Sequence, residues 1–133
     1  MELKFYNCGI CGNLIIKLND SGMTPYCCGR SMETLTPQTK EEEFGEKHVP
    51  TCTIEGHKIH IKVGAVEHPH TKEHHIEWIY VLTNHGAIIR YLDPEEAPEI
   101  CLRLSKDDWV DKIFVHCNLH GLWMCDCGCT IAL

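Results

Sequence analysis

The residue types best suited to chemistry lie near the C-terminal end of the chain, in segment 115–123, which reads VHCNLHGLW. Cys117 and His120 stand three residues apart, after an apolar run typical of a strand and just before Gly121. A thiolate and an imidazole at this spacing can bind one metal ion from a single tight turn. Two ligands do not complete a metal site, so further donors must come from elsewhere in the chain.

Two upstream segments carry the best candidates for those donors. They are Glu46-Lys47-His48 and segment 68–74, HPHTKEH, and together they offer four histidines with a carboxylate in reserve. If His48, His68 and His74 join Cys117 and His120, one ion has five protein ligands, whereas structural zinc prefers four. Four imidazoles in a plane with one axial thiolate suit iron and leave a sixth position open.

This ligand set predicts redox chemistry. An axial thiolate pushes electron density through the metal, as an axial cysteine does in haem enzymes that cleave O–O bonds. A carboxylate that binds only the oxidised ion would keep the charge of the site constant, and Glu46 is placed to do this. Lys47 adds a mobile cation, which is useful if the substrate is a small anion. We expect the remaining histidines at the surface or in the core: His57, His60, His70, His75, His85 and His116.

A second cluster of donors lies near the N-terminus. Cys8 and Cys11 form a C-x-x-C knuckle with glycines that let backbone amides turn toward the sulfurs, and Cys27 and Cys28 follow after fifteen intervening residues. A unit below roughly 40 residues usually needs a metal or disulfides to hold its fold. Four thiolates at this spacing favour a tetrahedral site over a pair of disulfides, and both zinc and iron accept such a set. The adjacent pair predicts a distorted geometry.

The composition agrees with metal binding. The chain has 133 residues, ten cysteines, ten histidines and a formal net charge of −7. The acidic balance and the lack of a basic stripe argue against nucleic acid as a partner. We find neither a secretory leader nor an apolar run of membrane-spanning length, so we expect no membrane association and a location in the reducing cytoplasm.

Short strands must position these donors. From Glu46 onward the pattern has period two and is rich in β-branched residues, which predicts strands at 51–54, 58–63, 76–83, 87–92, 100–104 and 112–116. Nothing shows a sustained helical period. The sequence therefore predicts a mostly β protein, with a metal knuckle at 1–37, a linker from Pro37 to about Phe44, and an antiparallel β-sandwich filling the rest of a 38–133 domain. Two further strands are expected near 14–18 and Tyr26.

The remaining cysteines and the tryptophans have simpler explanations. We expect Cys52 and Cys101 to be small buried residues of the sandwich. The tail cysteines are expected as thiols, with a redox-sensing or metal-delivery role as the alternative: Cys125, Cys127 and Cys129. We expect the tryptophans in the core: Trp78, Trp109 and Trp123.

Taken in this order, the motifs resemble those of a known family. Cys8-x-x-Cys11 with Cys27-Cys28 resembles a desulforedoxin-like iron centre. Glu46-Lys47-His48, His68-Pro69 followed by His74, and Cys117-Asn118-x-His120-Gly121-x-Trp123 resemble the active site of desulfoferrodoxin, the two-iron superoxide reductase. The likeness covers nearly the whole chain to about Trp123, and the added tail cysteines depart from the pattern.

The resemblance implies a fold, an activity and partners. The fold would be an iron knuckle followed by an immunoglobulin-like sandwich in a homodimer. The activity would be the one-electron reduction of superoxide to hydrogen peroxide, with Lys47 attracting superoxide and Glu46 closing on ferric iron. The implied cofactors are two irons per chain, and the implied electron donor resembles rubredoxin. The alternatives are a rubredoxin-like one-electron carrier and a metal-binding protein without catalysis, neither of which needs Glu46-Lys47-His48.

Overall fold

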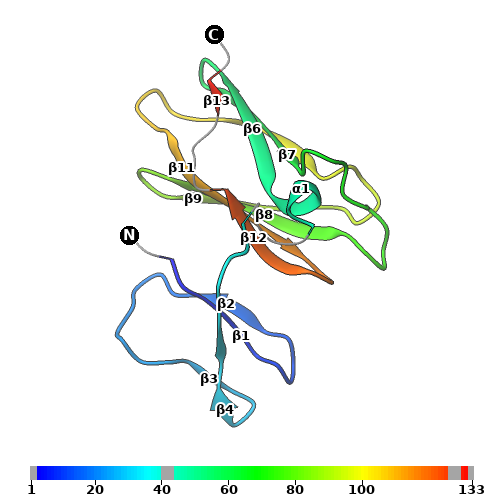
Figure 1. The fold of residues 1–133 in the computed structure, drawn as a ribbon. Coiled ribbons are helices and arrows are strands. Elements are labelled where there is room, and N and C mark those ends of the chain that lie inside the picture. Colours follow the sequence, from blue (N-terminus) through cyan, green and yellow to red (C-terminus); the bar gives the residue numbers. More distant parts are fainter. Residues whose placement is uncertain (1–2, 40–43, 126–129, 132–133) are drawn as a thin grey trace. The chain divides into compact units, whose positions relative to one another are not determined.

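The computed structural model describes residues 3–39, 44–125 and 130–131, and the chain divides into two compact units, Met1–Thr36 and Pro37–Leu133. The charge run at 40–43 and the cysteines Cys127 and Cys129 lie outside the described residues. In agreement with the prediction, the fold is nearly all β and its sheets are mainly antiparallel (Figure 1).

The first unit is a small sheet with a hairpin. Strands β1 (Phe5–Asn7), β2 (Leu14–Ile16) and β5 (Glu33–Leu35) form an antiparallel sheet in the order β2-β1-β5. Strands β3 (Tyr26–Cys27) and β4 (Arg30–Ser31) form the hairpin. Among its described residues, Tyr6, Cys8 and Met32 form one buried cluster with Cys27 packed against it, and Phe5 is also buried. A unit of this length has room for only a small core, which supports the expectation that the four cysteines need a metal to stabilise it.

The second unit is a sandwich of two four-stranded sheets. One sheet has the order β10-β7-β6-β13, with β10 (Glu99–Arg103), β7 (Lys58–Val63), β6 (Pro50–Glu55) and β13 (Thr130–Ile131). The other has the order β12-β11-β8-β9, with β12 (Gly121–Cys125), β11 (Val110–Cys117), β8 (Ile76–Thr83) and β9 (Ala87–Tyr91). Among the described strands of this unit, every strand pairing is antiparallel except that of β13 with β6.

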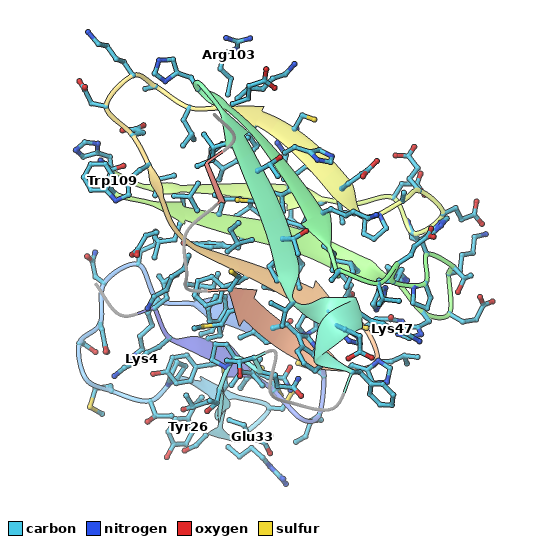
Figure 2. The ribbon with its side chains drawn as sticks, turned by 45° about the horizontal axis from the view of Figure 1, so that its top comes forward. Lys4, Tyr26, Glu33, Lys47, Arg103 and Trp109 are labelled. Atoms are coloured by element: carbon cyan, nitrogen blue, oxygen red, sulfur yellow. The ribbon has the colours of Figure 1, made fainter. Side chains whose placement is uncertain are left out.

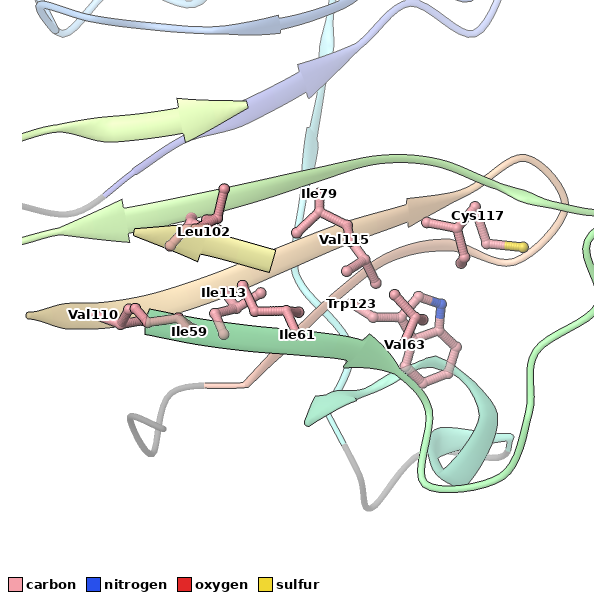
Figure 3. Close-up of a cluster of buried hydrophobic side chains, with 12 residues drawn as sticks. Ile59, Ile61, Val63, Ile79, Leu102, Val110, Ile113, Val115, Cys117 and Trp123 are labelled. Atoms are coloured by element: carbon pink, nitrogen blue, oxygen red, sulfur yellow. The ribbon is translucent and has the colours of Figure 1, made fainter. Parts of the chain in front are cut away.

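Alternation of side chains explains which residues form the core. In β7 the exposure alternates strictly, so that Ile59, Ile61 and Val63 are buried while the residues between them face outward. Their side chains meet those of β8 and β11 between the sheets, and Cys117 and Trp123 lie at one end of this cluster (Figure 3). The core therefore reaches the segment from which the sequence predicts a metal ligand.

One short helix departs from the sequence expectation, which contained no helix. Helix α1 (Gly45–His48) follows Phe44, whose backbone is left-handed at φ 67°. It packs so closely on Gly64 (φ 86°) that a Cβ there would collide with the carbonyl oxygens of Lys47 and Val66. A single turn has too few residues to show a period, which is why the pattern did not reveal it. The helix brings Glu46, Lys47 and His48 together.

Two expectations about the core were wrong. Trp109 is 62% exposed (Figure 2), because it precedes β11 at the end of the sandwich, where Val110 takes the buried position. Cys101 is also exposed, since it faces outward from β10 and Leu102 faces inward. Cys52 packs half-buried on the core, as expected, but it is disulfide-bonded rather than a free thiol.

Candidate metal centres

In the first unit, the four cysteines of the N-terminal motifs form one group, their sulfurs all within 4.8 Å of one another. The Cys11 and Cys27 sulfurs are 3.5 Å apart, and those of Cys27 and Cys28 are 4.0 Å apart. Sulfurs about 2.3 Å from one ion at tetrahedral corners lie about 3.8 Å from each other. The spacing therefore fits a four-thiolate ion. Cys28 reaches its place with a left-handed backbone at φ 54°, which accommodates two adjacent ligands.

The electrostatics of this group also favour a cation. Backbone N–H groups of Cys11 and Ile10 point at the Cys8 sulfur and lower the pKa of that thiol to about 6. The neighbouring sulfurs of Cys11, Cys8 and Cys27 raise the pKa of the Cys28 thiol to about 12. Several thiolates in so small a space repel one another, and a bound metal ion relieves that repulsion.

The second group of donors lies in the sandwich, where four histidines and Cys117 converge. His48, His74, Cys117 and His120 present ligand atoms within 4.8 Å of one another. His68 joins them, since its Nε2 lies 3.1 Å from Nε2 of His48 and 3.4 Å from the Cys117 sulfur. The structure thus brings together all five residues of the predicted second ligand set.

The arrangement of the nitrogens matches a square rather than a tetrahedron. Nδ1 of His120 is 3.1 Å from Nε2 of His74, the same separation as between His68 and His48. Two nitrogens about 2.1 Å from one ion and at right angles to each other lie about 3 Å apart. Neighbouring ring centroids are 4.6–4.9 Å apart, and His48 and His74 lie across the diagonal at 6.4 Å.

Backbone carbonyls fix the orientation of two of these rings. Nδ1–H of His48 donates to the Phe44 carbonyl at 2.9 Å, and Nδ1–H of His68 donates to the Pro69 carbonyl at 2.6 Å. Each bond leaves the Nε2 lone pair directed at the centre of the group. The indole of Trp123 stacks on the His48 ring at 4.5 Å. The sequence motif contained Trp123 but gave no sign of the two carbonyls.

The sulfur of Cys117 lies at the buried end of β11 and is fully enclosed. Burial raises the pKa of this thiol, while backbone N–H groups of Leu119 and His120 point at the sulfur and lower it. Glu77 adds a smaller upward effect. A buried thiolate without a cation is costly, so the amides and a metal ion must stabilise the charge together.

The imidazoles are kept neutral by the same burial. His48 and His68 are almost inaccessible, and loss of water lowers the pKa of both, that of His68 to about 4. Desolvation also lowers the pKa of His74. Neutral imidazoles are the form that binds metals, so the group is ready for an ion at neutral pH.

Glu46 and Lys47 precede the ligand His48 in the single turn of α1, where Figure 2 labels Lys47. Glu46 is exposed, and its carboxylate is outside the converging group in the described structure. The Lys47 charge lies close enough to His48 and His74 to lower the pKa of both. Among the described residues, no Cys, His, Asp or Glu other than these five joins the donor group.

The other histidines make contacts outside the donor group. Nδ1 of His116 lies 2.6 Å from Glu77, and His70 contacts the Glu67 carboxylate and the Glu95 carbonyl.

Asn118, which the sequence showed only as part of a motif, connects the turn that follows Cys117 to the segment that carries His74. Its side chain accepts from the His75 N–H and donates to the Glu73 carbonyl, both at 2.9 Å.

Comparisons with known proteins agree with this geometry. The desulfoferrodoxin family model matches residues 40–126. The desulfoferrodoxin of Syntrophotalea carbinolica is 37% identical, over 92% of this chain and 94% of that protein. The chain belongs to the desulfoferrodoxin family. The crystal structure of the superoxide reductase from Treponema pallidum superposes with a TM-score of 0.76 and 31% identity, covering 93% of this chain and 97% of that one. The superoxide reductase of Pyrococcus abyssi is 33% identical over 59% of this chain and 84% of that protein.

Desulfoferrodoxins have two iron sites, and this chain carries a donor group for each. The first is the set of four cysteines, and the second is the set of four histidines with Cys117. Both fit iron by their donor chemistry: four thiolates at tetrahedral spacing, and a near-square of neutral imidazoles with one thiolate. Among the described residues, no helix is long and apolar enough to cross a membrane.

Proposed function

We propose that this desulfoferrodoxin is a superoxide reductase, which converts superoxide, one electron and two protons into hydrogen peroxide. The observation that carries the proposal is the second donor group. Four neutral imidazoles lie in a near-square, the Cys117 sulfur lies on one side, and the described residues supply no ligand on the other. When bound there, ferrous iron supplies the electron. The name of the structurally similar protein from Treponema pallidum supports the same activity.

The surrounding residues have distinct roles in this proposal. Cys117 would hold the iron through an anionic sulfur, whose charge the amides of Leu119 and His120 stabilise. Lys47 attracts the superoxide anion and orients the water that donates protons, because its charge lies near His48 and His74. Glu46, two residues before His48, would supply a carboxylate ligand to the oxidised iron and so balance its extra charge.

We assign residues 1–37 to a desulforedoxin-like iron domain and 38–133 to the superoxide reductase domain. An external donor of rubredoxin type returns the electron, and we propose that the protein acts as a cytoplasmic homodimer. The reducing cytoplasm suits the first site, whose four cysteines bind iron only as reduced thiolates. Light scattering on the purified protein tests the dimer directly.

The test of the activity is superoxide decay after pulse radiolysis of protein loaded with two irons per chain. Each superoxide consumed should yield one hydrogen peroxide and no dioxygen. Lys47→Ile should slow the capture step about tenfold at low salt and flatten its dependence on ionic strength. The matched control is Lys58→Ile, which removes an exposed lysine at the far end of β7.

Three outcomes would overturn parts of this proposal. Release of dioxygen would mean that the iron disproportionates superoxide rather than reducing it. A protein that takes up two irons but leaves superoxide untouched would instead be an electron carrier or a metal-binding protein. Equal salt dependence in the Lys47 and Lys58 variants would remove Lys47 from the capture step.

A further inference from the structure

Gln38, the second residue of the Pro37–Leu133 unit, lies against the turn that carries His120. Its backbone forms a parallel bridge beside Trp123, where its N–H donates to the Leu122 carbonyl and its own carbonyl accepts from the Met124 N–H, both at 2.9 Å. The sequence predicted a linker here. The structure instead shows a half-buried residue that extends the edge of β12.

The side chain of Gln38 reaches the metal-binding turn itself. Its Nε2 donates to the His120 carbonyl at 2.7 Å and lies 3.3 Å from the Leu122 carbonyl. The indole Nε1–H of Trp123 donates to the same His120 carbonyl at 3.0 Å. A carbonyl oxygen has two lone pairs, so these donors saturate it. The next residue, Gly121, adopts φ 82°, and Gln38 Nε2 is the nearest atom to the position of its absent Cβ.

The turn that Gln38 contacts contributes to the second iron site in two ways. It carries the His120 imidazole, whose Nδ1 lies 3.8 Å from the Cys117 sulfur. The backbone amides of Leu119 and His120, in the same turn, point at that sulfur. A residue that fixes the carbonyl of His120 therefore limits the rotation of both the ring and the N–H of the same residue. Hydrogen bonds to a metal-bound sulfur are among the factors that set the reduction potential of the metal.

We propose that Gln38 is a positioning residue for the second iron, acting through the backbone of His120 on the axial thiolate. Its side-chain hydrogen bonds in this region are with the backbone of the turn rather than with a ligand atom. Loss of its amide would loosen the His120 turn and weaken the N–H contact to the Cys117 sulfur. More negative charge would then remain on the sulfur, which favours ferric over ferrous iron and lowers the reduction potential.

The test uses the full-length protein with both irons and the variant Gln38→Leu, which keeps the bulk and removes the donor. The matched control is Thr51→Val, which deletes a side-chain hydrogen bond to the Lys62 carbonyl in the same unit, from an exposed position of β6 that contributes no metal donor. Chelator competition measures iron affinity, with the first iron in each chain as the internal reference. We expect the affinity of the second site to fall five- to tenfold and its reduction potential to drop, with no change at the first site or in Thr51→Val.

A double-mutant cycle with Trp123→Phe separates positioning from general stability. The phenylalanine keeps a ring next to His48 but removes the second donor to the His120 carbonyl. Since each single variant leaves the carbonyl one of its two donors and the double variant leaves it none, the double variant should lose more affinity than the two single variants together. Gln38→Met repeats the measurement if the leucine variant does not fold. A lower melting temperature with unchanged iron affinity and unchanged reduction potential would overturn the proposal. It would mean that Gln38 only stabilises the edge of β12.

Discussion

Acidification of the iron-free protein should destabilise the sandwich through His68. This imidazole is fully buried, and the loss of water lowers its pKa to about 4, whereas an exposed histidine has a pKa near 6.5. Between these two values the unfolded chain binds a proton that the folded chain does not. The free energy of unfolding therefore falls as the pH drops from 6.5 to 4.

The size of the effect follows from the two pKa values. A lowering from 6.5 to about 4 corresponds to about 3 kcal/mol lost from the free energy of unfolding at the acid end. His48 and His74 are shifted in the same direction by burial and add to the loss. In a domain of this size about 1 kcal/mol changes the melting temperature by at least about 4 °C, so His68 alone should lower it by about 12 °C.

Tryptophan fluorescence is the appropriate assay, because all three tryptophans lie in the second unit and report on it alone. Melting temperatures are measured from pH 6.5 to 4 for the wild-type protein, for His68→Gln, and for His57→Gln as a control at an exposed histidine. The His68 variant should show the smaller dependence on pH. If the melting temperature falls by the same amount in all three proteins between pH 6.5 and 4, the buried neutral imidazole of His68 is not the cause of the acid sensitivity.

Three further changes separate the two metal sites and the tail. Cys117→Ser should abolish superoxide reduction and the thiolate-to-iron absorption band, because a hydroxyl is too weak an acid to supply the axial anion; a surviving band would place the thiolate elsewhere. Cys28→Ser should empty or distort the first site while the pre-reduced second iron reacts at a nearly normal rate, since all of its donors lie in the other unit. Ending the chain after Met124 should leave two irons per chain, because both described donor groups lie upstream, and a lost metal equivalent would contradict this.

The strands were predictable where one face is buried and the other is not. The period-two pattern gave β7 and β8 with their observed ends, since both run through the sandwich core. It missed β12, which begins at Gly121 directly after the ligand turn, and β13, which pairs over two residues. It also missed α1, because one helical turn has no period to detect.

The donors of the second site were predictable from residue types, but their support was not. Cys117, His120 and the upstream histidines carry metal-binding side chains, so spacing and chemistry pointed to them. Phe44 and Gln38 act through a carbonyl and through one amide, and neither residue type indicates a metal site. Only the folded chain shows that His48 donates to the residue four positions before it, or that a residue of the supposed linker reaches His120.

The distribution of the ligands over the fold has a physical logic. Cys117 ends a central strand that pairs with β8 on one side and β12 on the other, so the sulfur comes from a rigid part of the sandwich. His48 comes from a single helical turn, and His68 and His74 come from the segment between β7 and β8. That segment is held by few backbone bonds, such as Val66 N–H to the Glu46 carbonyl and the turn at Thr71. The thiolate therefore comes from the centre of a sheet, whereas these imidazoles come from the connections around it. There the folded backbone orients the rings one by one, through the Phe44 carbonyl for His48 and the Pro69 carbonyl for His68.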